Sequence, residues 1–319
     1  MNALVLAYRL ARFVVGHPVK FAHTLVSPKE RFLELSSRGF YSSMPDDAYL
    51  KRKYCYKMGR ELDLENPKTF TEKLQWLKLY DRRPEYTIMA DKYAVKKFVA
   101  DKIGTEYVIP LLGVWDRFED IDFDALPEQF VLKCTHDSGG FAICRDKAKF
   151  DREAARKKLN SSLRNNYYPK SREWVYKNIP PRIIAEVYME DESSINLPVY
   201  KFFTFNGEPK IIQVIQDDKT KQESIDYFDT NWQRLDLRQN YPNSKIPLSR
   251  PQCLDEMLRL AAQLSAGVPH VRVDLYQING KVYFSEFTFY SDAGLVPFIP
   301  SEWDNTLGSW IELPAEKHC

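Results

Sequence analysis

Cysteine is sparse in this sequence, and its spacing excludes two classes of site. The 319 residues contain five cysteines, which are scattered and include no Cys-x-x-Cys pair. Neither a zinc site nor a disulfide framework is therefore expected. An odd number of dispersed thiols fits a reducing compartment, so we expect a cytoplasmic protein.

A long apolar run is also missing. The most apolar segment, residues 4–15, is interrupted by Arg9 and Arg12 and is shorter than the roughly 20 residues of a membrane-spanning helix. It lacks the preceding basic residues and the following small-residue cleavage site of a signal peptide. Two interpretations stay open: an amphipathic helix in a membrane interface, which would make the protein membrane-peripheral, or a helix packed on the protein body.

An excess of one charge is missing as well. Lys and Arg together number 46 against 44 Asp and Glu, which gives a net charge of +2. A nucleic-acid-binding protein usually has a clear basic excess, so no nucleic-acid partner is expected. Hydrophobic residues at 44% provide for a globular core, and no internal repeat or low-complexity tract indicates a solenoid.

Two helices are predicted in the first third of the chain. Thr69 and Glu72 have the spacing of a capping box, and apolar residues recur behind them with helical period, which predicts a helix over 69–81 with one buried face. A second helix is predicted over about 90–103, where Gly104 marks its end.

From about residue 127 the pattern changes to strands and turns. Short apolar runs at 130–134 and 141–144 flank a glycine turn, and another strand is predicted at 182–188. Asn-Gly dipeptides at 206–207 and 279–280 are each flanked by apolar runs, the strongest short signal of a hairpin. Helices mixed with hairpins predict an α+β fold.

The last predicted hairpin carries alternating polar residues. Arg272 and Asp274 share one face of the first strand by period two, and Glu286 and Thr288 share one face of the second. If the two faces coincide, the two carboxylates and the guanidinium lie close together. The carboxylates could then bind Mg²⁺, and the guanidinium could neutralise the negative charge of a phosphate. The alternative is a solvated sheet face with ordinary cross-strand ion pairs.

A second candidate is Lys133, which ends a buried strand shortly before Ser138-Gly139-Gly140. The lysine could reach a phosphate while the glycines let backbone N–H groups approach it. The spacing is neither that of a Walker loop nor that of a dinucleotide fingerprint. An ordinary hairpin turn is the alternative.

The order of these features resembles the ATP-grasp superfamily, and specifically the TupA-like ATP-grasp family, named for teichuronopeptide biosynthesis. The resemblance covers roughly residues 60–313. The stretches that carry it are Asn66-Pro67-Lys68-Thr69-Phe70-Thr71-Glu72-Lys73-Leu74-Gln75-Trp76, Asp91-Lys92-Tyr93-Ala94-Val95, Phe130-Val131-Leu132-Lys133, Tyr200-Lys201-Phe202, His270-Val271-Arg272-Val273-Asp274-Leu275-Tyr276 and Phe284-Ser285-Glu286-Phe287-Thr288-Phe289.

The resemblance implies ATP and Mg²⁺ as cofactors and an ATP-grasp fold of two α+β subdomains that clasp the nucleotide. Lys133 and Arg272 would be catalytic through the phosphates, and Asp274, Glu286 and Thr288 would form the metal set. The nucleotide-binding residues would be Lys133, Ser138, Gly139, Gly140, Glu186 and Lys201, with Glu186 beside the adenine. Val199 stands where the family usually has an acidic residue, so a ribose contact made by that residue would be weakened here or relocated to Asp191 or Glu192.

The implied organisation has four parts. An N-terminal helical extension covers 1–60, and an N-terminal ATP-grasp subdomain covers 61–126. A nucleotide-binding subdomain with the glycine-rich hairpin covers 127–200, and 201–319 carries the metal-binding hairpin.

The implied function is an ATP-dependent carboxylate–amine ligase acting through an acyl phosphate. Its substrates would be a small-molecule or polysaccharide-precursor carboxylate, such as a uronic acid, and an amino acid or amine in bacterial capsule or surface-polysaccharide synthesis. The alternatives are a glycosyltransferase or sugar kinase of the same pathway, or a non-catalytic nucleotide-binding protein. No feature of the sequence predicts an oligomeric state.

Overall fold

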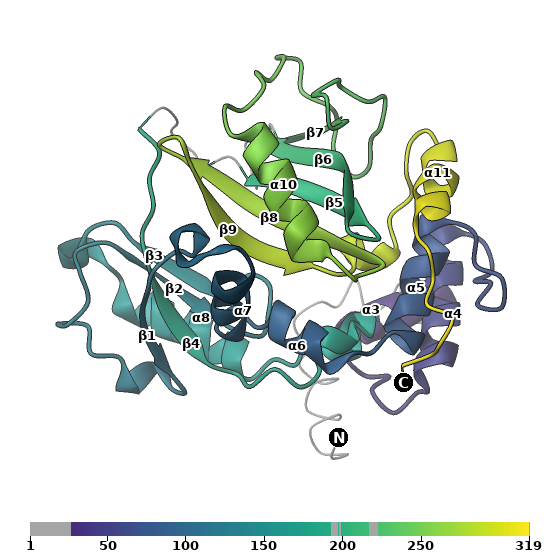
Figure 1. The fold of residues 1–319 in the computed structure, drawn as a ribbon. Coiled ribbons are helices and arrows are strands. Elements are labelled where there is room, and N and C mark those ends of the chain that lie inside the picture. Colours follow the sequence, from purple (N-terminus) through teal and green to yellow (C-terminus); the bar gives the residue numbers. More distant parts are fainter. Residues whose placement is uncertain (1–26, 193–196, 198, 217–222, 319) are drawn as a thin grey trace.

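The structure, a computed structural model, describes residues 27–192, 197, 199–216 and 223–318, and two antiparallel sheets organise them (Figure 1). The helix expected at residues 4–15 lies outside the described residues. The α-helices are α3 (Pro28–Ser37), α4 (Asp46–Met58), α5 (Phe70–Tyr80), α6 (Pro84–Ala90), α7 (Ala94–Ile103), α8 (Arg152–Leu163), α9 (Tyr168–Ser171), α10 (Leu254–Ser265) and α11 (Glu302–Trp310). The strands are β1 (Leu111–Trp115), β2 (Phe130–Cys134), β3 (Phe141–Cys144), β4 (Ile183–Val187), β5 (Val199–Phe205), β6 (Glu208–Gln216), β7 (Ser224–Phe228), β8 (His270–Ile278) and β9 (Lys281–Thr288).

The smaller sheet has the strand order β1-β4-β2-β3. Phe130 and Leu132 of β2 are fully buried and belong to one apolar cluster with Leu159 of α8. Since β1 pairs with β4, the boundary expected near residue 126 falls within this sheet.

The larger sheet has the order β7-β6-β5-β8-β9, and the two predicted Asn-Gly hairpins are confirmed as β5–β6 and β8–β9. At both turns the asparagine and the glycine have positive φ, of 51° and 85° at residues 206 and 207 and of 49° and 74° at 279 and 280. Positive φ at both central residues is the requirement of the type I′ turn, which asparagine followed by glycine meets best.

The two faces of the larger sheet differ in chemistry. On one face apolar side chains such as Ile212 and Val273 are fully buried and form one cluster with Leu260 of α10. Figure 1 shows α10 lying across the sheet. Because side chains alternate along a strand, the polar residues between these apolar ones lie on the opposite face. At β9, the edge strand, this opposite face lies next to the smaller sheet.

The helix predicted over 69–81 is confirmed as α5, with both capping-box hydrogen bonds between Thr69 and Glu72. The helix predicted over 90–103 ends correctly before Gly104, but its start is wrong. Asp91 interrupts it because its carboxylate accepts from Tyr93 N at 2.9 Å and from Arg182 Nη2 at 2.9 Å, so α6 and α7 are separate helices.

The N-terminal helices α3 and α4 pack on the molecule through a third apolar cluster. It combines Phe32 and Tyr54 of these helices with Leu79 of α5 and Leu295, which follows β9. Within the described ranges, no helix combines the length and the apolar character that a membrane span requires.

Candidate functional site

The last hairpin brings two carboxylates together. Asp274 on β8 pairs directly with Glu286 on β9, and Arg272 pairs with Thr288. Arg272 Nε and Nη2 donate to the two carboxylate oxygens of Asp274 at 2.7 and 2.9 Å, and Nη2 also donates to Thr288 Oγ1 at 2.9 Å. The guanidinium thus orients Asp274, and Thr288 helps to hold the guanidinium.

A one-residue bulge creates this convergence. Near the turn Leu275 pairs with Phe284, whereas Asp274 pairs with Glu286, so Ser285 is the extra residue. In a hairpin without the bulge, Asp274 would oppose Ser285, and Glu286 would point to the other face. The two polar faces coincide because of the bulge.

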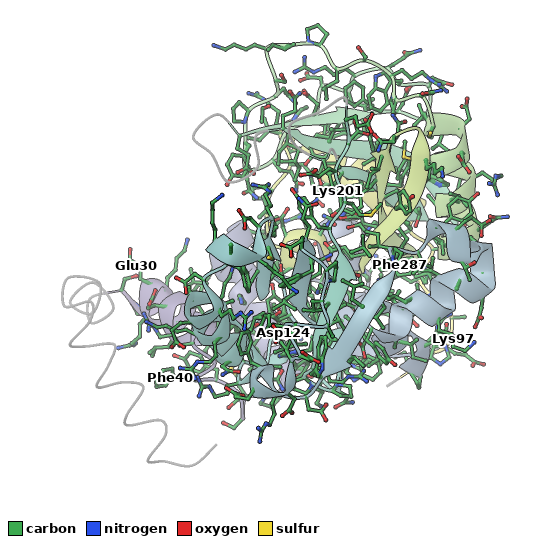
Figure 2. The ribbon with its side chains drawn as sticks, turned by 90° about the vertical axis from the view of Figure 1, so that its left-hand side faces the viewer. Glu30, Phe40, Lys97, Asp124, Lys201 and Phe287 are labelled. Atoms are coloured by element: carbon green, nitrogen blue, oxygen red, sulfur yellow. The ribbon has the colours of Figure 1, made fainter. Side chains whose placement is uncertain are left out.

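Lys201 joins the carboxylates from the neighbouring strand. It pairs with Asp274 across β5 and β8, and its Nζ lies 3.7 Å from Asp274 Oδ2. In Figure 2 Lys201 lies where the part of the molecule formed by the larger sheet meets the rest, whereas Asp124 and Lys97 lie away from this junction.

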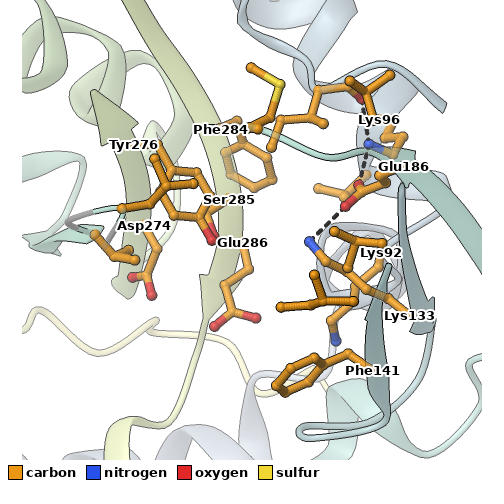
Figure 3. Close-up of a pocket in the computed structure, with 18 of the residues that line it drawn as sticks. Lys92, Lys96, Lys133, Phe141, Glu186, Asp274, Tyr276, Phe284, Ser285 and Glu286 are labelled. Atoms are coloured by element: carbon orange, nitrogen blue, oxygen red, sulfur yellow. Dashed lines mark hydrogen bonds and ion pairs between the residues drawn. The ribbon is translucent and has the colours of Figure 1, made fainter. Parts of the chain in front are cut away.

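The opposite wall is built from β2, β4 and α7. Lys133 Nζ lies 2.6 Å from Glu186 Oε2, and Lys96 Nζ lies 2.5 Å from Glu186 Oε1 (Figure 3). Burial raises the pKa of Glu186, but the two ammonium groups outweigh it and hold this pKa below its ordinary value. Burial lowers the pKa of Lys133, but the charge of Glu186 outweighs burial and holds this pKa above its ordinary value. The carboxylate of Glu186, expected beside the adenine, is therefore engaged by two lysines.

Lys92 and Lys96 were not predicted as site residues. Lys92 Nζ donates to the Asp137 carbonyl at 2.5 Å, Lys96 Nζ donates to the Ile109 carbonyl at 2.7 Å, and both side chains line the same cavity. Lys92 lies in the stretch Asp91–Val95 already matched to the family and Lys96 follows it directly, which was the signal available in the sequence.

The glycine-rich turn is anchored to the end of α8. Gly139 has a φ of 100°, which favours glycine, and a Cβ at Gly140 would lie 2.1 Å from Ser162 Oγ. Ser162 Oγ donates to the Asp137 carboxylate, and His136 Nε2 lies 3.2 Å from the carbonyl oxygens of both Ser162 and Asn165. Asp137 therefore supports the turn.

A cavity of about 530 Å³ lies between the two sheets, a volume within the range of small-molecule sites. Apolar side chains such as Val131, Ile143 and Phe284 line one part of it, while Lys133 and Glu286 line the polar part (Figure 3). Of the predicted site residues, the lining includes Lys133, Ser138, Gly139, Gly140, Glu186, Lys201, Asp274 and Glu286. Arg272 and Thr288 are not among the described lining residues and contact the site through Asp274.

Val199 also lines this cavity, opposite Tyr276. The acidic residues expected to replace its family counterpart lie at the β8–β9 turn instead. Asp191 accepts from Asn279 N at 2.7 Å, and Glu192 N donates to Asn279 Oδ1 at 3.0 Å.

Glu286 is surrounded by positively charged groups. Burial raises the pKa of Glu286, but the combined charges of Lys92, Arg272, Lys201 and Lys133 hold it below its ordinary value. In Figure 3 its carboxylate points toward the side of the cavity that carries Lys92 and Lys133.

The donor set fits a magnesium ion shared with a phosphate. In the part of the chain that is described, no group of three or more acidic, histidine or cysteine side chains is placed to hold a metal. Mg²⁺ is commonly held by one or two carboxylates, with substrate phosphates and water completing its shell. Asp274 and Glu286, directly opposite each other, supply such a pair.

The two sheets with a cavity between them define an ATP-grasp fold. The chain belongs to the TupA-like ATPgrasp family, which it matches over residues 72–312. Comparison with curated proteins gives no match.

Solved structures match parts of the chain at low sequence identity. D-alanine–D-alanine ligase from Bacillus anthracis, complexed with ATP, is 16% identical over 63% of this chain and 54% of its own, with a TM-score of 0.36. The same enzyme from Helicobacter pylori is 13% identical over 76% and 69%, with a TM-score of 0.41. A RimK domain ATP-grasp protein from Sphaerobacter thermophilus is 11% identical over 71% and 69%, with a TM-score of 0.38. The chain thus spans about half the length of the first of these ligases.

Proposed function

We propose that this chain is an ATP-dependent carboxylate–amine ligase that forms an amide through an acyl phosphate. The observation that carries the proposal is the pair Asp274 and Glu286, which faces Lys92 and Lys133 across one cavity. Such a site positions phosphate groups and neutralises their charge, which is most of what phosphoryl transfer requires of a protein.

The first step would transfer the γ-phosphoryl group of ATP to a carboxylate oxygen of the acid. The oxygen–phosphorus bond to ADP breaks while the bond to the carboxylate oxygen forms. Lys92, Lys133 and Lys201 would hold the phosphates, since all three side chains line the cavity. Arg272 would keep Asp274 oriented and add positive charge near Glu286.

Asp274 and Glu286 would hold Mg²⁺, with Thr288 supporting them through Arg272. When bound, the ion supplies charge neutralisation at the phosphate oxygens. Ser138, Gly139 and Gly140 would cover the phosphates, because Gly139 adopts a φ of 100° and the turn lines the cavity.

In the second step the nitrogen lone pair of the amine would attack the acyl carbon, the bond from the acyl carbon to the phosphate oxygen would break, and the proton lost from the nitrogen would leave with the inorganic phosphate. No histidine or cysteine is among the described residues that line the cavity. This composition favours chemistry that depends on positioning over chemistry that needs a protein nucleophile. Asp137, a candidate base for activating a sugar hydroxyl, accepts from Ser162 Oγ through one oxygen, whereas its Oδ1 has no partner among the described residues, so a sugar kinase is the alternative that the experiment below tests.

The acid would be a precursor of capsule or another surface polysaccharide, such as a uronic acid, and the amine an amino acid or small amine. The support for this part is the membership of the TupA-like family. Of the expected boundaries, those at residues 60 and 200 are proposed on the same basis.

Transfer of heavy oxygen tests the proposal. A uronic acid labelled in its carboxylate is incubated with ATP, Mg²⁺ and a panel of amines, and the inorganic phosphate is analysed by mass spectrometry. A ligase moves one carboxylate oxygen into the phosphate and forms an amide. A phosphorylated sugar without labelled phosphate would overturn the ligase in favour of a kinase, and Glu286→Gln serves as the inactive control.

A further inference from the structure

A row of polar side chains crosses the larger sheet, with one residue from each strand. The row lies on the face that borders the cavity, which we call the cleft face. Neighbours in the row are direct pairing partners. From β9 to β7 the row is Glu286, Asp274, Lys201, Gln213 and Tyr227. The first three line the nucleotide cavity, whereas the last two have no part in the phosphoryl transfer proposed above.

A second bulge brings the outer two residues onto this face. Near the Asn206-Gly207 turn Thr204 pairs with Pro209, whereas Phe203 pairs with Ile211, so Lys210 is the extra residue. Without it, Gln213 would point to the apolar face under α10. A one-residue bulge in β9 and another in β6 thus place Glu286 and Gln213 on the same face of the sheet.

The amide of Gln213 has a fixed orientation. Its Nε2 donates to the Tyr227 hydroxyl at 2.8 Å, and that hydroxyl donates in turn to Gln239 Oε1 at 3.0 Å. Because the hydroxyl proton is committed, the nitrogen of Gln213 must face β7. Its oxygen therefore points away from the Tyr227 hydroxyl.

This oxygen is an acceptor without a donor. Gln213 is 4% exposed, and within the described ranges its Oε1 has no hydrogen-bond partner. Ser291 Oγ, on the segment that follows β9, is a second buried oxygen of this kind. Gln239, which accepts from the Tyr227 hydroxyl, also donates to the Val296 carbonyl at 3.4 Å, so the segment after β9 contacts the outer end of the row. Buried polar atoms are normally paired, and unpaired ones call for a ligand or another explanation.

We infer that Gln213, oriented by Tyr227, binds a hydroxyl group of the acid substrate and makes the site selective for polyhydroxylated carboxylic acids. The inference rests on the proposed ligase function. Neighbouring strands are about 4.8 Å apart, so Gln213 lies roughly 5 Å along the row from Lys201 and roughly 10 Å from Asp274. Because side chains from both ends of the row reach toward the substrate, its donor group must lie several ångströms from its carboxylate, as the ring hydroxyls of a uronic acid do. The ammonium of an α-amino acid is attached to the carbon next to the carboxylate and is too close.

The experiment compares two acids of similar ring size. D-glucuronate carries hydroxyls around its ring, and cyclohexanecarboxylate carries none. The rate of heavy-oxygen transfer into phosphate gives kcat/KM for each acid, and KM for ATP is measured in parallel. The variants are Gln213→Met and Tyr227→Phe, with Gln216→Met as the matched control on the opposite face of the same strand. Melting temperatures of all variants verify folding.

The wild type should prefer D-glucuronate. Gln213→Met should lower kcat/KM for D-glucuronate by about tenfold to hundredfold and leave that for cyclohexanecarboxylate and the KM for ATP unchanged. Tyr227→Phe should act in the same direction by a smaller factor, and Gln216→Met should have no effect. Equal losses for both acids, or a Gln213→Met variant that behaves as Gln216→Met does, would overturn the inference.

Failure of the ligase proposal has a different signature. If the wild type transfers label from neither acid, the ligase proposal fails, and calorimetric binding of D-glucuronate in the presence of ADP and Mg²⁺ then decides the inference. Weaker binding by Gln213→Met than by Gln216→Met supports it. No binding by the wild type, or equal binding by both variants, overturns it.

Discussion

Arg272 and Asp274, two residues apart on β8, form a bidentate ion pair with N–O distances of 2.7 and 2.9 Å. Asp274 is only 1% exposed, so the guanidinium is its main compensation for the loss of water. The two hydrogen bonds fix the orientation of the Asp274 carboxylate. Glu286, which pairs with Asp274 across the strands, is more exposed and less constrained.

The first prediction concerns these carboxylates. Asp274→Asn and Glu286→Gln should each lower Mg²⁺-dependent ATP turnover at least about a hundredfold, because a charged oxygen ligand is lost from the proposed metal site. Turnover is measured as phosphate release against magnesium concentration, and circular dichroism verifies the fold. Glu302→Gln, an exposed change in the first turn of α11, is the control. Full turnover in either site variant would remove that residue from the metal set.

The second prediction separates the structural role of Lys133 from its role in nucleotide binding. Glu186→Leu should lower the free energy of unfolding by roughly 3 kcal/mol, because Lys133 and Lys96 lose the carboxylate between them. Adding Lys133→Met should restore part of this stability, since one buried ammonium is removed. ATP affinity should stay low in the double variant. Chemical denaturation and calorimetry give the two quantities, and recovery of affinity together with stability would contradict a phosphate contact by Lys133.

The third prediction is a pH dependence that arises from His270. Burial lowers the pKa of His270 to about 3, with Arg272 adding to the effect and the hydrogen bond to the Thr204 carbonyl at 2.8 Å opposing it. The unfolded chain binds a proton near pH 6.5 and the folded chain does not, so stability falls as the pH decreases from 6.5 toward 3.

Between pH 7 and pH 5 this one group should cost about 2 kcal/mol of unfolding free energy. His270→Asn keeps a donor near the Nδ1 position and cannot titrate, so its stability should fall by correspondingly less over that range. Urea denaturation at both pH values provides the comparison, with the exposed His318→Gln as control. Identical pH dependences for wild type and His270→Asn would show that folding does not lower the pKa of His270.

The fourth prediction concerns backbone strain after β9. Ala293 has a φ of 56°, a left-handed conformation that costs a residue with a Cβ about 1–2 kcal/mol. Ala293→Gly should therefore raise the free energy of unfolding by about 1 kcal/mol. The same change at Ala100, inside α7, should lower it by about 1 kcal/mol. Thermal or chemical denaturation measures both, and a loss of stability at both positions would show that Ala293 is not strained.

Much of the fold could be predicted because its signals are local. The capping box of Thr69 and Glu72 and the two Asn-Gly turns each depend on a few neighbouring residues, and the structure contains them as predicted. The break at Asp91 was missed because its cause, the ion pair with Arg182, joins residues far apart in the sequence.

The site could be predicted only in part. Period two placed Arg272 with Asp274 and Glu286 with Thr288, but the bulge at Ser285 decides whether those pairs face each other. Bulges follow from backbone geometry that the residue pattern does not specify. Lys96 and Glu186 come together through packing of α7 on the smaller sheet, which no short motif encodes.

The alternation of polar and apolar residues across the larger sheet also bears on how this protein could evolve. Ile212 and Val214 are part of the core with α10, while Gln213 between them faces the cleft. Because neighbouring positions on a strand contribute to different surfaces, a substitution at Gln213 changes the cleft face and leaves the side chains packed under α10 in place. Tyr227 is itself part of the buried core, so a substitution there changes the packing as well. Substrate range and stability can thus be inherited as separate traits at Gln213 but not at Tyr227.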